Sequence, residues 1–255
     1  MKDFVLEVCV DSIESAIAAW KGGAIRLELC SDLIVGGITP SIELFRMVKE
    51  EVPLPVHVLI RPRFGDFLYT DWEYNLMCRQ IRSFVNAGAD ALVIGSLKAD
   101  GTLHGEQMEG MMEHAAGRKI TLHRAFDVTR DAIEAFETAR SLGVDTILTS
   151  GQEKDCYTGK ECLCKLLQIS KETRQPDILI GGGVNAEVIS KLCAEMPAEC
   201  PKSFHMSGKE VLPSNMEYRN SKVSMGLPGI SEFEIYRTSE CAVRAAAEVL
   251  RKNIF

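Results

Sequence analysis

A seven-residue pattern occurs twice near the start of the chain, and it limits what the rest can fold into. The segment Leu6-Glu7-Val8-Cys9-Val10-Asp11-Ser12 is followed 21 positions later by Leu27-Glu28-Leu29-Cys30-Ser31-Asp32-Leu33. In both copies apolar residues alternate with Glu and Cys, which is the period of a β-strand with two different faces. If the two strands pair in parallel and near register, two carboxylates and two thiols lie side by side at one end of a sheet. The alternative is that each cysteine is a small core residue.

Strand-like and helix-like patterns alternate along the whole chain. The predicted strands are 4–9, 25–30, 56–61, 91–95, 120–123, 146–149, 178–181 and 204–206. The predicted helices are 12–20, 41–51, 72–86, 106–116, 131–141, 160–173, 185–194 and 241–252. The run Thr39-Pro40-Ser41 is expected to open one helix, and Gly88 or Gly143 to close another. Eight strands and eight helices, with strands about 28 residues apart, predict a single TIM-like (β/α)8 barrel over residues 1–255.

Composition excludes several classes of partner and compartment. The formal net charge is −7 and no basic run offsets it, which argues against a nucleic-acid surface. The sequence contains no stretch of about 18 apolar residues, so no membrane span is predicted. The N-terminus enters a strand pattern without the apolar region of a signal peptide, so we expect a cytoplasmic protein. The nine cysteines are odd in number and irregularly spaced, which favours reduced thiols over a disulfide framework.

The strand positions that should face the barrel interior are unusually polar. Interiors of this fold are normally filled by branched apolar side chains. Two buried carboxylates raise each other's pKa unless cations intervene, and Arg26 and Arg61 are the expected partners. A closed ion network of purely structural origin is one explanation. A site is the other, because active sites of this fold lie at the C-terminal ends of the strands. The inward residues are Glu7, Cys9, Arg26, Glu28, Cys30, His57, Arg61, Thr121, His123, His205 and Ser207.

Several loops at that end carry residues suited to an anion. Loops after the seventh and eighth strands often bind phosphate through backbone N–H groups, and here they contain Gly182 and Lys209. Arg61 and Arg63 follow the third strand, and guanidinium groups suit carboxylate or phosphate. The simpler alternatives are a tight glycine turn and an Arg–Asp clamp that orders the loop. The candidate anion-binding residues are Arg61, Arg63, Gly182 and Lys209.

Acid–base chemistry has its own candidates. His123 and Asp127 lie at the end of the fifth strand, where they could exchange protons with a substrate. Alternatively, the loop carboxylate only holds the histidine. Together with the two strand glutamates, the candidate catalytic residues are Glu7, Glu28, His123 and Asp127.

A set of motifs spread over nearly the whole chain resembles the CutC copper homeostasis family. The resemblance implies a TIM-like barrel, a cytoplasmic homo-oligomer and a role in copper handling, with Cys9 and Cys30 holding Cu(I). Phe64 stands where many members have Gly, and Met206 where a smaller residue is common, so the mouth is expected to differ in detail. The motifs are Leu6-Glu7-Val8-Cys9, Glu28-Leu29-Cys30, Gly36-Gly37-Ile38-Thr39-Pro40-Ser41, Ile60-Arg61-Pro62-Arg63 with Gly65-Asp66-Phe67, His123-Arg124-Ala125-Phe126-Asp127, Leu148-Thr149-Ser150-Gly151-Gln152, Gly181-Gly182-Gly183, His205 with Ser207, and Tyr218-Arg219-Asn220 with Ser224-Met225.

Two classes of function therefore stay open. In the first, the protein binds or traffics Cu(I) through the cysteine pair, with the copper ion as its partner. In the second, it is an enzyme that acts on a small anionic or phosphorylated substrate. The barrel interior contains more polar side chains than a two-thiol metal site needs, which favours an enzyme. The paired cysteines favour copper binding.

Overall fold

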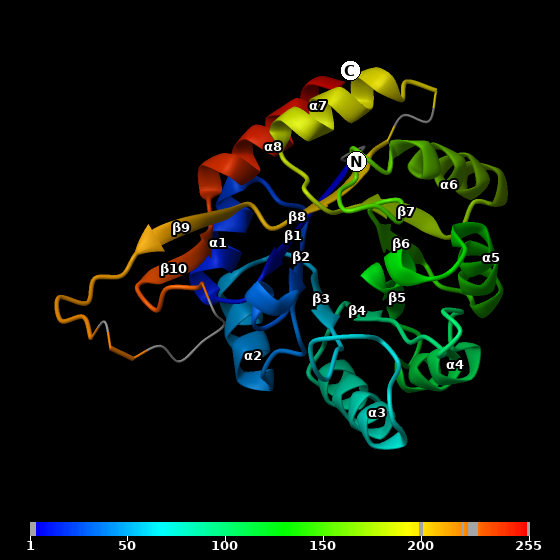
Figure 1. The fold of residues 1–255 in the computed structure, drawn as a ribbon, viewed down its shortest axis with the longest axis horizontal. Helices are drawn as coiled ribbons and strands as arrows, with labels where there is room; N and C mark the ends of the chain where they lie inside the picture. Colours follow the sequence, from blue (N-terminus) through cyan, green and yellow to red (C-terminus); the bar gives the residue numbers. More distant parts are fainter. Residues whose placement is uncertain (1–3, 199–200, 221, 224–228, 254–255) are drawn as a thin grey trace.

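Eight parallel strands close into a barrel surrounded by helices (Figure 1). The structure is a computed structural model, and it describes residues 4–198, 201–220, 222–223 and 229–253, so that Ser224 and Met225 of the last motif lie outside the described residues. The strands follow the order β1 to β8, and β8 pairs with β1 to complete the ring. The predicted (β/α)8 barrel is confirmed. None of the helices in the described ranges has the length and apolar character needed to cross a membrane.

The element boundaries lie within a few residues of the predicted ones. The barrel strands are β1 (Val5–Val10), β2 (Arg26–Leu29), β3 (Val56–Leu59), β4 (Ala91–Ile94), β5 (Lys119–Leu122), β6 (Thr146–Thr149), β7 (Asp177–Ile180) and β8 (Ser203–Met206). The helices are α1 (Ile13–Gly22), α2 (Ile42–Glu51), α3 (Asp71–Asn86), α4 (Gly105–His114), α5 (Ala132–Leu142), α6 (Lys160–Thr173), α7 (Ala186–Glu195) and α8 (Glu240–Asn253). Two 3-10 turns, η1 (Leu33–Val35) and η2 (Arg124–Val128), follow β2 and β5.

Local capping chemistry accounts for several helix ends. The Ser41 hydroxyl accepts a hydrogen bond from the Leu44 N–H at 3.1 Å and so begins α2, as predicted. Gly143 closes α5 with φ at 82°, a left-handed conformation that glycine adopts without a steric penalty. Helix α3 opens with a reciprocal capping box between Thr70 and Glu73.

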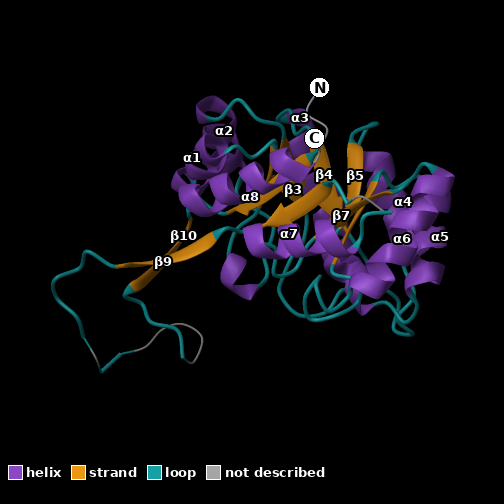
Figure 2. Ribbon diagram, turned by 90° about the horizontal axis from the view of Figure 1, so that it is seen from above, coloured by secondary structure: helices purple, strands orange, loops and turns teal. Residues whose placement is uncertain are grey.

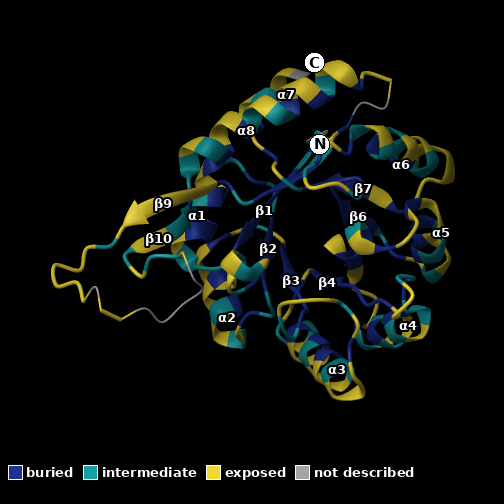
Figure 3. Ribbon diagram, in the orientation of Figure 1, coloured by how far each residue is buried: buried dark blue, intermediate teal, exposed yellow. Residues whose placement is uncertain are grey.

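The main hydrophobic core lies between the barrel strands and the surrounding helices (Figure 3). Leu6, Val8, Leu27 and Leu29 are fully buried members of that layer. The opposite parity of the same strands faces the barrel interior and carries the polar residues, as the alternation predicted. The buried polar residues of that interior include Glu7, Glu28, His57, Thr121, His123 and His205.

A second small sheet lies outside the barrel and was missed by the sequence patterns. Strand β9 (Lys209–Pro213) pairs antiparallel with β10 (Glu234–Thr238), and this hairpin projects away from the barrel beside α1 (Figure 2). All five residues of β9 are exposed, so no buried face imposes a period on its sequence. Its partner strand lies more than 20 residues further along the chain, too far for a hairpin-turn signal. After the hairpin, α8 packs against α1 and α7 and completes the helical ring.

Candidate functional site

A small cavity opens at the C-terminal ends of the barrel strands. Its volume is about 120 Å³. The lining combines apolar side chains with several ionisable ones, which is the usual character of a small-molecule site. We call it the mouth cavity, and its lining residues are Cys9, Glu28, Leu33, Gly36, Leu59, Arg61, Phe67, His123, Arg124, Leu148 and His205.

The register of the first two strands decides which polar groups meet. Cys9 of β1 lies opposite Glu28 of β2, and Glu7 lies opposite Arg26. The two copies of the repeated motif are therefore offset by two residues and are not aligned Glu to Glu and Cys to Cys. Closing a barrel requires such a stagger between neighbouring strands. The sequence-based picture of carboxylate beside carboxylate and thiol beside thiol needs this correction: each copy's Glu and Cys have different neighbours.

Glu7 is the centre of a buried ion cluster. Arg26 Nε donates to its Oε2 at 2.5 Å, and His205 Nδ1 lies 2.7 Å from its Oε1. His57 Nδ1 is 3.4 Å from Oε2 but makes no hydrogen bond. Burial by itself raises the pKa of Glu7, but Arg26, His205 and His57 outweigh it and hold this pKa well below its usual range. Glu7 is therefore ionised, and both of its oxygens have partners.

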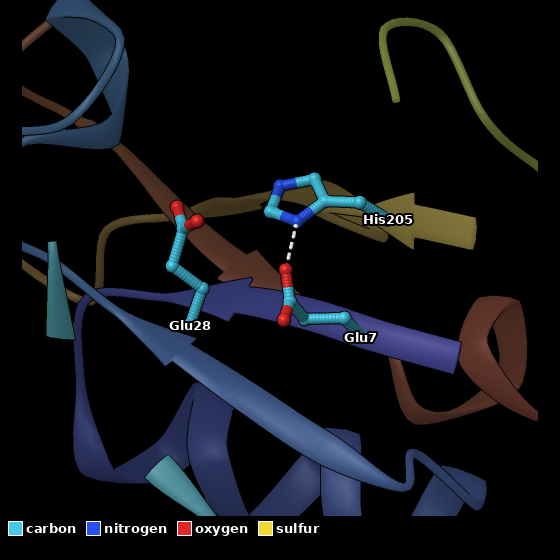
Figure 4. A group of neighbouring side chains, drawn as sticks. All are labelled: Glu7, Glu28 and His205. Atoms are coloured by element: carbon cyan, nitrogen blue, oxygen red, sulfur yellow. Dashed lines mark hydrogen bonds and ion pairs between the residues drawn. The ribbon is translucent and has the colours of Figure 1, made fainter. Parts of the chain in front are cut away.

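Glu28 is in the opposite electrostatic situation. Burial raises the pKa of Glu28 to about 7, with a further contribution from the Glu7 charge. Its Oε2 atom has no hydrogen-bond partner among the described residues. Figure 4 shows the Glu28 carboxyl from β2 beside the Glu7–His205 pair formed by β1 and β8. A carboxyl whose pKa is near neutrality can both accept and return a proton at physiological pH.

His205 connects this cluster to the cavity. Burial alone lowers the pKa of His205, but its neighbours Cys9 and Glu28 and the bond to Glu7 raise it well above its usual value. The bond from Nδ1 to Glu7 fixes the ring orientation, as a carboxylate does for many functional histidines. Ligand atoms of Glu7, Glu28 and His205 lie within 4.8 Å of one another, a spacing that suits a metal ion. A metal there would have to compete with Arg26 and His205 for the oxygens of Glu7.

The two candidate metal-binding cysteines have different environments. Cys9 lines the mouth cavity, and its Sγ donates a weak hydrogen bond to the Met206 carbonyl at 3.6 Å. Cys30 is fully buried, packs against Leu59 and Val93, and donates to the Val10 carbonyl at 3.5 Å. Burial raises the pKa of Cys30 well above its usual value, and the charges of Cys9 and Glu28 add to the effect. Cys30 thus bonds to the residue that follows Cys9 on β1, but of the two thiols only Cys9 lines the cavity.

The four candidate anion-binding residues do not converge. Arg61 lines the mouth cavity. Arg63 donates to Glu73 at 2.5 Å and to Asp66 at 2.9 Å, so its guanidinium orders the loop after β3. Lys209 lies over the Tyr236 ring and lines a separate cavity of about 220 Å³ at the base of the hairpin. Gly182, with φ at 89°, lies beside Ser150 and Arg124.

His123 and Asp127 have separate environments. His123 lines the mouth cavity, where burial and the Arg61 charge lower its pKa to about 3. Asp127 accepts hydrogen bonds from Thr149 Oγ1 at 2.5 Å and from the Ser150 N–H, and it pairs with Arg124 at 2.6 Å. Its carboxylate thus links η2 to the end of β6. Asp127 is not among the lining residues, and it holds Arg124 in place instead of His123.

Arg124 is an ionisable cavity residue that the sequence patterns did not select. It lines the mouth cavity, and its Nη2 donates to Ser150 Oγ at 2.9 Å. Its position directly after His123, at a strand end, was the available signal. Strand parity assigned the inward direction to His123 and gave no direction for the first residue of the following turn.

Comparisons with known proteins identify the family. The profile of the CutC family matches residues 4–208. The chain belongs to the CutC family. A Bacteroides fragilis family protein CutC is 40% identical over 256 residues, covering 100% of both chains. A human protein named copper homeostasis protein cutC homolog is 39% identical over 252 residues, covering 98% of this chain and 90% of its own.

Solved structures extend the comparison of this CutC-family chain to three dimensions. A putative copper homeostasis protein CutC from Streptococcus agalactiae superposes with a TM-score of 0.74 at 29% identity, covering 80% of this chain and 98% of its own. A thiamine phosphate pyrophosphorylase from Pyrococcus furiosus has a TM-score of 0.56 at 15% identity and covers 100% of this chain and 98% of its own. At that identity the second match shows the shared barrel fold alone. The family match ends at residue 208, where the β9–β10 hairpin begins.

Proposed function

We propose that this CutC-family protein acts in copper homeostasis by binding Cu(I) with Cys9 and Cys30. The observation that carries the proposal is the placement of two thiols at neighbouring strands: Cys9 of β1 lies opposite Glu28 of β2, and Cys30, directly after β2, donates to the carbonyl of Val10 of β1. Soft sulfur ligands favour Cu(I) over harder ions. The names of the relatives, copper homeostasis proteins, support the general role in copper homeostasis. In this proposal the copper ion is cargo and enters past Cys9, the thiol that lines the cavity.

Proton release should accompany binding. Both ligands must be thiolates, whereas burial and nearby carboxylates keep Cys30 protonated. Copper affinity is therefore expected to weaken as pH falls, because protons compete for both sulfurs. Zn(II) binds weakly in this proposal, since a structural zinc site uses four protein ligands.

An anaerobic competition titration against a Cu(I) chelator tests the proposal. We expect one tight equivalent per chain, abolished by either Cys9→Ser or Cys30→Ser. Cys156→Ser and Cys241→Ser are matched controls, one in the hydrophobic core and one exposed on α8, and both should retain the equivalent. Undiminished copper retention in the Cys9/Cys30 double variant would contradict the proposal.

A second candidate function is acid–base catalysis on a small anionic substrate. It is favoured by two neighbouring carboxyls with pKa values displaced in opposite directions, Glu7 downward and Glu28 upward to about 7. Such divergence is how enzymes assign acid and base roles to similar groups. In this candidate Glu28 exchanges the proton, and Glu7 positions His205. Glu28→Gln should abolish turnover yet leave the Cu(I) equivalent in place, which separates the two candidates.

A further inference from the structure

Arg61 carries a buried positive charge that no carboxylate in the described ranges neutralises. Arg61 is 8% exposed, and its guanidinium donates to the carbonyls of Gly37 at 3.1 Å and Gly65 at 2.8 Å. Its Nε atom has no partner within those ranges. Carbonyl groups hold the guanidinium in place but carry no net charge to offset it. Because an unpaired buried charge is costly, an anion in the mouth cavity is strongly favoured.

His123 presents a neutral hydrogen-bond donor to the same cavity. Its Nδ1 accepts the Ala125 N–H at 3.1 Å, so in the neutral ring the proton is on Nε2. That Nε2 atom is buried and has no partner in the described part of the chain. On the other edge of the ring, an added Cβ at Gly95 would lie 2.4 Å from Cε1. The edge next to Gly95 and Ala125 is thus closed, and Nε2 is the ring nitrogen left for a ligand.

Phe67 connects the two unused donors. The Arg61 guanidinium carbon lies 4.9 Å from the centre of the Phe67 ring. The centres of the Phe67 and His123 rings are also 4.9 Å apart, and the two rings are tilted relative to each other. All three side chains line the mouth cavity. One wall therefore combines a cation, an apolar ring and a neutral N–H donor. A ligand that matches this wall has one negative charge, a flat body and a separate uncharged acceptor oxygen.

We propose that the mouth cavity binds a small 2-oxo carboxylate, with its carboxylate paired to Arg61 and its keto oxygen accepting from His123 Nε2. The inference rests on the second candidate function, a small-anion site at the mouth, and names its ligand class. The cavity of about 120 Å³ has the volume of about four waters at roughly 30 Å³ each, which suits a short-chain acid. A phosphate dianion is less suited, because Lys209 lies at a different cavity and His123 is uncharged.

Calorimetric titration of the intact chain with pyruvate and with propionate tests the pairing. Propionate has the same carboxylate but lacks the keto oxygen. We expect pyruvate to bind about tenfold more tightly, the value of one buried hydrogen bond. His123→Leu should remove this preference and leave propionate binding unchanged, whereas His123→Gln, which keeps an N–H donor, should retain most of it. His114→Leu, at the end of α4, is the control histidine variant.

Equal affinity for pyruvate and propionate in the unsubstituted protein overturns the inference, and this comparison needs no variant to fold. Tighter binding of inorganic phosphate than of pyruvate also overturns it. Deuterium exchange at the pyruvate methyl, followed by NMR in D2O, separates this inference from the function on which it rests. Preferential pyruvate binding without exchange supports the ligand class and counts against catalysis. Exchange of dihydroxyacetone phosphate, an anion without a carboxylate, in the absence of pyruvate binding supports catalysis and overturns the ligand class.

Discussion

His205 Nδ1 lies 2.7 Å from Oε1 of Glu7, so a buried ion pair joins the last strand of the barrel to the first. The two residues are also paired in the β1–β8 register. The pair therefore closes the barrel and orients the His205 ring at the cavity with the same contact. Structural and functional roles are coupled at this position, and they can be separated by measurement.

Glu7→Gln is expected to lower the free energy of unfolding by about 3–5 kcal/mol, because Arg26 and His205 lose the charge that compensates theirs. The pKa of His205 should fall in the same variant, which an NMR titration of the ring would detect. Glu134→Gln, which removes an exposed pair with Arg130, is the control and should change stability little. Similar effects from both substitutions would contradict the proposed cluster.

Glu28→Gln should change how stability depends on pH. The pKa of Glu28 is raised from 4.5 to about 7. Its contribution to the free energy of unfolding is therefore fully present below about pH 4.5 and is lost as pH rises through 7. The Glu28→Gln side chain does not ionise, so the variant does not lose stability in this way. Its stability relative to the unsubstituted protein should increase between pH 5 and pH 8 by on the order of 2–3 kcal/mol. Urea unfolding at several pH values measures this difference, and a pH-independent difference would contradict the raised pKa.

Gly95→Ala should displace the His123 ring, because the new Cβ would lie 2.4 Å from Cε1 and 2.6 Å from Nδ1. We expect a loss of about 1–3 kcal/mol of stability from overpacking, together with loss of the preference for pyruvate over propionate. Gly105→Ala is the matched control, since nothing lies within 4 Å of its added Cβ. Retained ligand preference in Gly95→Ala would show that the ring position is not required.

Thiol labelling should distinguish the cysteines in the native protein. Cys241 is exposed on α8 and should react with iodoacetamide first. The half-buried Cys162, Cys164 and Cys193 should follow, and Cys9, which is buried at the cavity wall, should react slowly. Cys30 should stay unmodified, because it is fully buried and its pKa is raised well above the usual value. Bound Cu(I) should protect Cys9. Peptide mapping by mass spectrometry gives the order of labelling. Labelling of Cys30 at the rate of Cys241 would contradict the buried environment of Cys30.

Much of the fold was predictable because its signals are local. The alternation in Leu6-Glu7-Val8-Cys9 assigned Glu7 and Cys9 to the barrel interior, where the structure has them. Ser41 and Gly143 marked helix ends through hydrogen bonds and dihedral angles that involve only nearby residues. Eight repetitions of strand and helix then leave a closed barrel as the favoured way to bury every apolar face.

The partners of the polar groups depend on the tertiary structure. Placing Cys9 opposite Glu28 follows from the stagger of the closed barrel, which no single strand encodes. Whether Arg63 faces a ligand or Glu73, and whether Asp127 holds His123 or Arg124, depends on how loops distant in the sequence pack together. The alternation of residues determined which side chains enter the barrel, because strand period is a local property. Barrel closure decided which of them meet, because register and loop contacts are set by the whole chain at once.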